Sequence, residues 1–120
     1  MAKTLDIPHI DLAGDVSIPQ FGLGVFQVPP EKTFENVTHA LNVGYRHIDT
    51  ARAYQNEAQV GQAVKSSDLS REELFITTKL WNDDIRRGSV TDAFDQSLER
   101  LGLEFIDLSP DDRAAIARLT

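Results

Sequence analysis

The sequence predicts an α/β protein built around a parallel sheet. Strand-like runs alternate with helix-like segments of about ten to fifteen residues, and the apolar residues of those segments recur with helical spacing. Strands joined by helices of this length form right-handed βαβ units, in which the strands lie parallel. At 120 residues, 41% of them hydrophobic, the chain is long enough for one globular domain.

The first elements are predicted to be a β-hairpin, a short apolar run and a helix. Residues 9–12 and 16–18 flank the turn residues 13–15, which is typical of a hairpin. The run 20–26 contains Gly22 and Gly24, where the backbone bends or approaches another group closely. After two prolines, the apolar spacing predicts a helix over 30–43, and Gly44 stands where a helix would end.

Further strand and helix segments follow in alternation. We expect a strand over 45–49 and a helix over 56–65, then a strand over 74–80 and a helix over 89–101. A short fourth strand is expected over 105–108. Residues 109–112 (SPDD) have the composition of a helix start, with Ser as the cap, Pro in the first turn and acids beside the positive helix end.

Composition excludes several classes of function. The chain has 12 Lys and Arg against 19 Asp and Glu, a formal charge of −7, so we expect binding to neither nucleic acid nor membrane surfaces. It has no spanning apolar stretch and no signal-like start, and a cytoplasmic protein is expected. Without cysteine there is no disulfide, and the histidines lack metal-ligand spacing, so no metal site is expected.

Three titratable residues form a candidate site. Asp49 is the last residue of the strand expected over 45–49, and Lys79 lies at the end of the strand expected over 74–80. Tyr54 lies in the loop after Asp49. The carboxyl ends of adjacent parallel strands meet at one edge, about 4.8 Å apart, so these side chains should share one rim of the sheet. Alternation places His47 on the same face as Asp49, two residues deeper.

This combination suits proton donation. A free tyrosine titrates near pH ~10 and is a weak acid at neutrality. A neighbouring ammonium stabilises the phenolate, and a carboxylate keeps that ammonium charged. Such a site could reduce a carbonyl, but no side chain supplies hydride, so a nicotinamide cofactor would be needed.

Spacing alone leaves a structural interpretation open. Asp49 could cap the following turn, Lys79 could be a solvated strand end, and Tyr54 could pack on the second helix. Trp81 could form a pocket wall or cover the surface. The two glycines of the run 20–26 lack the third glycine of a dinucleotide-binding fingerprint.

Four stretches resemble the aldo-keto reductases, particularly the bacterial diketogluconate and small-aldehyde reductase type. They are IPQFGLGVFQV (18–28), GYRHIDTARAYQNEAQVG (44–61), LFITTKLWN (74–82) and DQSLERLGLEFIDL (95–108). The resemblance covers essentially residues 5–108 in the order and spacing of the family. It implies a partial (β/α)8 TIM barrel, about the first three and a half β/α units after an N-terminal β-hairpin, plus a short C-terminal helix. Residues 1–108 would form the N-terminal part of the barrel.

The resemblance also implies NADPH-dependent reduction of aldehydes and ketones to alcohols. Tyr54 would be the general acid, and Lys79 and Asp49 would tune it. Asp49 would in addition bind the cofactor through its ribose.

The remaining implied site residues surround the reacting end of the cofactor. Gly24, Val25 and Phe26 would lie against the nicotinamide. Phe26 and Trp81, together with Tyr54, would contact the small carbonyl substrate.

The sequence departs from the family after Leu108. In the family the fourth strand continues into a segment that carries the histidine of the site, whereas Ser109 follows here. Residues 109–120 form a tail that resembles the sequence near the C-terminus of family members. No matched motif supplies the residues that bind the nicotinamide amide or the 2'-phosphate. The alternative is therefore a truncated, non-catalytic half-barrel that has lost cofactor binding and self-associates through open sheet edges.

Overall fold

The structure is a computed structural model that describes residues 5–102. Within this part the strands form two sheets, an antiparallel pair β1–β2 and a parallel sheet in the order β3–β4–β5. The predicted α/β class and the parallel βαβ connections are confirmed. The expected strand 105–108, the C-terminal helix and the boundary between residues 108 and 109 lie outside the described residues.

The predicted hairpin is present. Strands β1 (His9–Asp11) and β2 (Ser17–Pro19) pair antiparallel, with Ile10 opposite Ile18. Gly14 and Asp15 both have positive φ, at 74° and 60°, and these values let the chain reverse within a short turn.

The parallel sheet is formed by β3 (Leu23–Gly24), β4 (His47–Asp49) and β5 (Phe75–Thr77). Its register aligns Gly24 with Asp49 and Asp49 with Thr77. The strands are shorter than the runs expected from sequence. One backbone hydrogen bond joins the β4 and β5 segments just past the end of β4: the Thr50 N–H donates to the Thr77 carbonyl at 2.8 Å. The chain then turns into the loops at the carboxyl ends of the strands.

The three long helices agree with the sequence to within one residue at each end. They are α1 (Pro30–Val43), α2 (Glu57–Ser66) and α4 (Val90–Leu101). Two 3₁₀ turns, η1 (Arg52–Tyr54) and η2 (Arg71–Glu73), and the short helix α3 (Asn82–Arg86) were not expected. Two acidic residues in the first turn of α3 favour its positive end.

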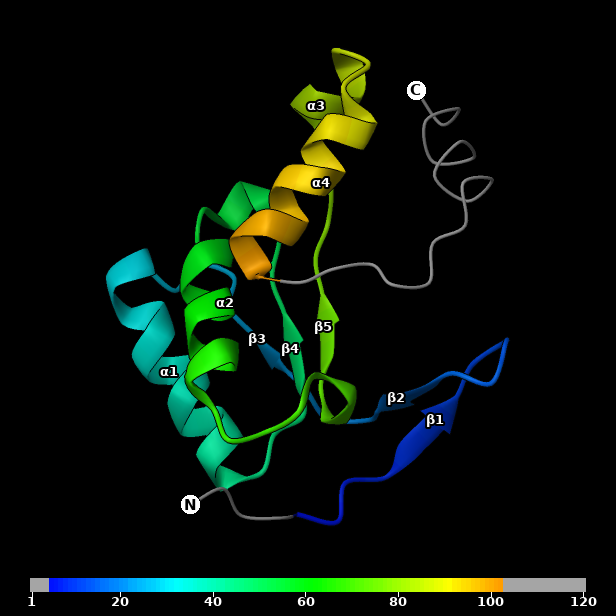
Figure 1. Ribbon diagram of the computed structural model, residues 1–120, viewed down its shortest axis with the longest axis vertical. Coiled ribbons are helices and arrows are strands. Elements are labelled where there is room, and N and C mark those ends of the chain that lie inside the picture. The colour runs from blue at the N-terminus through cyan, green and yellow to red at the C-terminus, as the bar shows by residue number, and fades with distance from the viewer. Residues whose placement is uncertain (1–4, 103–120) are drawn as a thin grey trace.

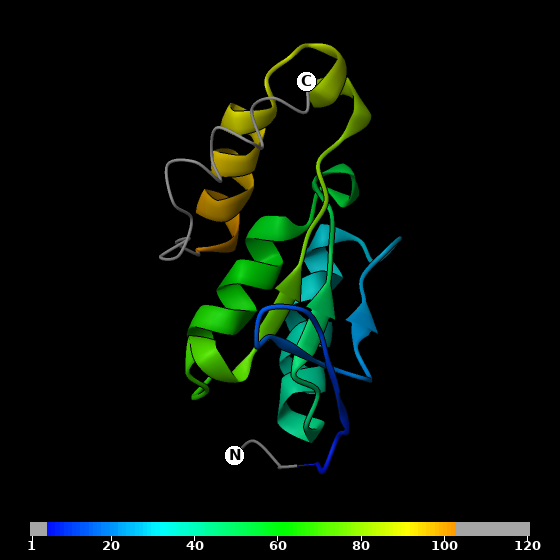
Figure 2. The ribbon, with the colours of Figure 1, turned by 90° about the vertical axis from the view of Figure 1, so that its right-hand side faces the viewer.

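The helices lie to one side of the parallel sheet. Figure 1 shows α1 and α2 on that side, with the β1–β2 hairpin away from them. In Figure 2, α4 and α3, coloured orange to yellow, lie beyond the end toward which β4 and β5 point. The core between helices and sheet consists of Val25, Val37, Leu41, Ile48, Val60, Ala63, Leu74 and Leu101. None of the helices in residues 5–102 is long and apolar enough to cross a membrane.

Two glycines explain local features that the sequence suggested. A Cβ on Gly22 would lie 2.8 Å from Nδ1 of His47, so only glycine lets the segment before β3 pass over that ring. Gly44 ends α1 with a left-handed φ of 115°, as its position predicted.

Candidate functional site

Lys79 lies at the centre of the candidate site. Its Nζ donates to Oδ1 of Asp49, to the carbonyl of Thr50 at 3.0 Å and to the Tyr54 hydroxyl at 3.4 Å. An ammonium has three N–H donors, and each therefore has an acceptor here. The structure thus brings together the three residues that the sequence selected.

Backbone contacts place these side chains. The Arg52 N–H donates to the Lys79 carbonyl at 3.2 Å, so η1 lies directly against the end of the β5 segment. Tyr54 ends η1, and Gln55 after it has a left-handed φ of 59°, which turns the chain away. The Tyr54 ring centroid lies 5.1 Å from Nζ of Lys79.

The electrostatics keep the ammonium charged. Burial alone would lower the pKa of Lys79, but hydrogen bonds to Asp49 and Tyr54 raise it, and the pKa lies above its ordinary value. The ion pair stays accessible to solvent, with side-chain exposures of 47% for Lys79 and 36% for Asp49. Because Lys79 only donates, the Tyr54 oxygen is the acceptor in their contact, and the phenolic proton remains free for another group.

Phe26 and Gly24 lie on the same rim. The Phe26 ring is 64% exposed, and its centroid is 5.2 Å from that of Tyr54. Gly24 pairs with Asp49 across the sheet and has open space where a Cβ would be. The exposed ring and the bare backbone give this end of β3 a surface that a flat ligand can approach.

Val25 differs from its neighbours because its side chain belongs to the core. It is fully buried, and its N–H donates to the Asp49 carbonyl at 3.0 Å. Its own carbonyl accepts from the Asn56 amide at 3.0 Å. Because no part of Val25 is exposed, a ligand at this rim would contact its neighbours Gly24 and Phe26 rather than Val25 itself.

Trp81 is joined to the same turn as Tyr54. The Arg52 guanidinium carbon lies 5.3 Å from the Trp81 ring centroid, a cation–π contact. Arg52 Nε is also 3.2 Å from Oδ2 of Asp84, an ion pair whose two atoms are not aligned as a hydrogen bond. These contacts connect η1 with the start of α3 and place Trp81 at the rim.

His47 occupies the deeper position that strand alternation predicted. Its Nε2 lies 2.9 Å from Oγ1 of Thr77, and its ring packs edge-on against Phe75 with centroids 5.1 Å apart. His47 is therefore held within the sheet face below Asp49. The described residues contain no cluster of three or more potential metal ligands.

The sequence interpretation missed two buried polar residues at the start of α2. Asn56 bonds to the Val25 carbonyl and to Thr50, and Glu57 bonds to Thr78 at 2.7 Å and forms an ion pair with Arg100 at 2.8 Å. The available signal was two polar residues directly after Tyr54. That pattern is equally typical of an ordinary helix start, because Asn is a common N-cap and an acid favours the first turn.

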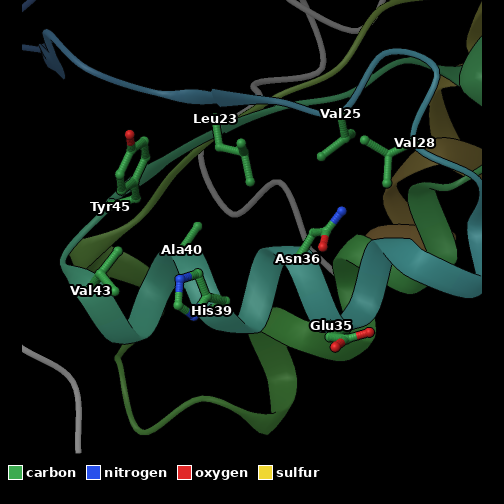
Figure 3. A pocket seen from close by; sticks show the side chains of 9 residues that line it. All are labelled: Leu23, Val25, Val28, Glu35, Asn36, His39, Ala40, Val43 and Tyr45. Atoms are coloured by element: carbon green, nitrogen blue, oxygen red, sulfur yellow. The ribbon is translucent and has the colours of Figure 1, made fainter.

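A separate hollow of about 530 Å³ lies between β3 and α1. Figure 3 shows Leu23 and Val25 pointing toward α1, with Ala40 facing them. Its lining includes Tyr45 and the buried Val25, but not Asp49, Tyr54 or Lys79. The hollow thus follows the outer side of β3, which pairs only with β4 among the described strands.

This arrangement is that of a partial (β/α)8 barrel with titratable residues at the carboxyl ends of its strands. The chain belongs to the aldo/keto reductase family, whose family model matches residues 19–109.

Individual relatives agree with this assignment. An aldo-keto reductase of Mycolicibacterium smegmatis is 50% identical over 101 residues, and a methylglyoxal reductase of Escherichia coli is 54% identical over 91 residues. These alignments cover 84% and 76% of this chain. An aldo-keto reductase of Bombyx mori, solved in complex with NADP, superposes with a TM-score of 0.78 at 38% identity over 91% of this chain.

The chain spans well under half of each relative. The aligned part is 37% of the Mycolicibacterium protein, 32% of the Escherichia coli enzyme and 42% of the Bombyx mori chain. The family and the partial barrel are therefore established for this chain. The activity of a whole reductase is a proposal.

Proposed function

We propose that this chain carries the proton-donating part of an NADPH-dependent reductase site for aldehydes and ketones. Tyr54 is the general acid, and Lys79 and Asp49 tune it. The observation that carries the proposal is the contact of one ammonium with both the Asp49 carboxylate and the Tyr54 hydroxyl. Membership of the aldo/keto reductase family supports it independently.

The proton transfer follows from the hydrogen-bond directions. As a substrate carbonyl accepts hydride at carbon, negative charge grows on its oxygen, and the free phenolic proton of Tyr54 moves to that oxygen. The Lys79 ammonium, already donating to the phenolic oxygen, stabilises the phenolate that remains. Asp49 holds the ammonium in place, so the site does not have to reorganise during the step.

The residues of the rim fit the nicotinamide end of NADPH. Gly24 leaves open space beside Asp49, and the exposed Phe26 ring offers an apolar face next to Tyr54. When bound, NADPH supplies the hydride that no side chain can provide. Gly24 and Phe26 would lie against its nicotinamide, buried Val25 would support them from the core, and Asp49 would bind its ribose.

The substrate pocket would accept small carbonyl compounds. Phe26 and Trp81 would contribute aromatic walls. The Phe26 ring contacts that of Tyr54, and Trp81 contacts Arg52 of the same 3₁₀ turn. A relative from Escherichia coli is a methylglyoxal reductase. Methylglyoxal is therefore a suitable first substrate for assay.

The two tyrosines of the chain provide a matched test. NADPH oxidation at 340 nm with methylglyoxal should fall by about 10²- to 10⁴-fold in Tyr54→Phe, because the general acid is lost. Tyr45→Phe removes a hydroxyl from a residue that precedes β4, at the end of this strand opposite Asp49, and should leave the rate unchanged. Equal rates in the two variants would contradict the assignment of Tyr54, and failure of the unaltered chain to bind NADPH by fluorescence would contradict the reductase itself.

The alternative is a non-catalytic half-barrel that self-associates. Among the described strands, β3 and β5 each pair on one side only, and such edges template pairing with other chains. Large apolar side chains are exposed around the hairpin, namely Ile10, Leu12, Val16 and Phe21. Size-exclusion chromatography with light scattering distinguishes the two proposals, since the alternative requires a concentration-dependent mass together with no NADPH binding.

A further inference from the structure

Asn56 connects two segments of the rim that lie far apart in sequence. Its buried Nδ2 donates to the carbonyls of Val25 at 3.0 Å and Val28 at 3.2 Å, which bracket Phe26. Its Oδ1 accepts from Oγ1 of Thr50 at 2.7 Å. The two carbonyls can only accept, so the amide nitrogen has to face them and the amide oxygen has to face Thr50.

The helix that begins at Asn56 does not use this side chain. Asn56 stands at the N-cap of α2, where an asparagine ordinarily accepts from a backbone N–H of the first turn. Here the side chain makes no such bond, and the Asn56 main-chain carbonyl accepts from the Val60 N–H at 3.1 Å. The buried amide therefore serves the contact between segments and not the helix start.

The same connection extends to Lys79. Thr50 is fully buried. Its hydroxyl donates a hydrogen bond to Oδ1 of Asn56, and its carbonyl accepts one from Lys79 Nζ. A continuous hydrogen-bonded path thus runs from the ammonium through Thr50 and Asn56 to the loop that carries Phe26.

The loop at Phe26 has two other bonds at its ends: the Val28 N–H donates to the Val25 carbonyl at 3.1 Å, and Thr33 Oγ1 donates to the Val28 carbonyl at 3.3 Å. The Phe26 side chain is largely exposed, so burial does little to fix it. Gln27 after it has a φ of 62°, a left-handed conformation uncommon for residues other than glycine. The contacts from Asn56 hold the loop on both sides of this turn and keep the Phe26 ring beside Tyr54.

We propose that Asn56, oriented by Thr50, is a positioning residue that holds Phe26 against the Tyr54–Lys79 pair. This role rests on the proposed reductase function, in which Phe26 walls the site. The path predicts that breaking the Thr50–Asn56 bond loosens the loop 25–28 before it affects the helices.

Substitutions at Thr50 distinguish the effect of its hydroxyl from the effect of the shape of the side chain. Thr50→Val removes the donor and nearly retains the shape, whereas Thr50→Ser retains the donor. In Thr50→Val, amide hydrogen exchange at Val25 and Val28 should become about two- to twelvefold faster, the range expected for one lost hydrogen bond. The nuclear Overhauser effect between the rings of Phe26 and Tyr54 should weaken, and both signals should return in Thr50→Ser.

Glu57→Gln provides the matched control at the next residue. Glu57 is equally buried, but it bonds to Thr78, Ser97 and Arg100. Its substitution should accelerate exchange in α4 and leave the loop 25–28 unchanged. Asn56→Ala should accelerate loop exchange at least as much as Thr50→Val.

Thr50→Val decides the proposal even if Asn56→Ala fails to fold. Unchanged loop exchange in Thr50→Val, or equal acceleration at Val37 of α1, would overturn it, because either result denies a local effect. The exchange and ring signals need no turnover, so loss of the proposed function and loss of the positioning role give different results. Where methylglyoxal is reduced, Thr50→Val should raise KM several-fold, whereas Tyr54→Phe lowers kcat.

Discussion

The charge on Lys79 depends on its three acceptors. Burial opposes the charged form, and hydrogen bonding to Asp49 and Tyr54 outweighs that effect, so the pKa of Lys79 is raised above its ordinary value of 10.5. The ammonium is then present throughout the neutral range. This matters for the proposed chemistry because only the charged form stabilises a phenolate at Tyr54.

Asp49→Asn should therefore lower the pKa of Lys79. The substitution removes the carboxylate that favours the ammonium but keeps the size of the side chain. NMR titration of lysine labelled with ¹³C at Cε, assigned with Lys79→Arg, measures the shift. A Lys79 pKa that is unchanged in Asp49→Asn would show that the ion pair does not raise it. Asp83→Asn, which removes the exposed ion pair with Arg86, is the control and should leave the pKa of Lys79 unchanged.

The same shift predicts how stability depends on pH. Lys79 has a higher pKa in the folded chain than the 10.5 of its ordinary state, so its contribution is fully present below about pH 10.5. It is lost as pH rises further, through the folded pKa. The difference in unfolding free energy between the unaltered chain and Asp49→Asn should shrink over that range in urea titrations, and a difference that grows would contradict the upward shift.

At the residue scale, sequence reasoning found the charged site but not its supports. Asp49 and Lys79 were predictable because the strand ends of a parallel sheet converge. Tyr54 was predictable because it lies in the loop that follows Asp49. Asn56 and Glu57 were not, since their partners Val25 and Arg100 lie 31 and 43 residues away. A buried polar bridge depends on which segments fold together, and the local pattern of a helix start gives no sign of it.

Among the elements, the contact between α2 and α4 depends on a single glycine. A Cβ on Gly61 would lie 2.5 Å from the Arg100 carbonyl oxygen and 2.8 Å from that of Leu101. Both are backbone atoms near the end of α4, so they cannot move without displacing the helix. The sequence predicted the helix over 56–65, but its periodicity could not show that the backbone of α4 would press against Gly61.

Gly61→Ala should destabilise the chain by about 1–3 kcal/mol through this overpacking. Alanine favours a helix by about 1 kcal/mol over glycine, so a free helix would be stabilised by the same change. Urea unfolding followed by circular dichroism measures the sign. Gln62→Ala at the next, exposed position should stay within about 0.5 kcal/mol, and a stabilised Gly61→Ala would show that α4 does not pack as described.

Element prediction succeeded where periodicity was long and failed where it was short. The helices over 30–43 and 89–101 carry several turns of regular apolar spacing, and their observed bounds agree to within one residue. Helix α3 spans only Asn82–Arg86, too few residues for a periodic pattern. The strand expected over 74–80 was too long because Thr78 and Leu80 continue the strand-like composition after the paired strand has ended at Thr77.

For the whole molecule, the partial barrel leaves the outer side of β3 without a partner among the described residues. The hollow beside it is lined largely by apolar side chains, including Leu23, Val28 and Val43. In a complete barrel every strand has two neighbours, so this side of β3 would be covered. The chain matches 42% of the solved relative from Bombyx mori, so it holds only part of such a barrel.

If the half-barrel self-associates, we expect a second copy to cover this hollow, and two adjacent substitutions on α1 test it. Val43→Lys places a charge in the hollow at the last residue of α1, whereas Asn42→Lys adds the same charge one residue earlier, at an exposed position outside the hollow. Both lysines suit the negative end of the helix, so neither should unfold it. Sedimentation velocity across concentrations should show weaker association for Val43→Lys and unchanged association for Asn42→Lys, because burying an unpaired ammonium in an apolar contact is costly. Equal effects of the two variants would show that only net charge matters, and association that persists in both would direct attention to the free edge of β5.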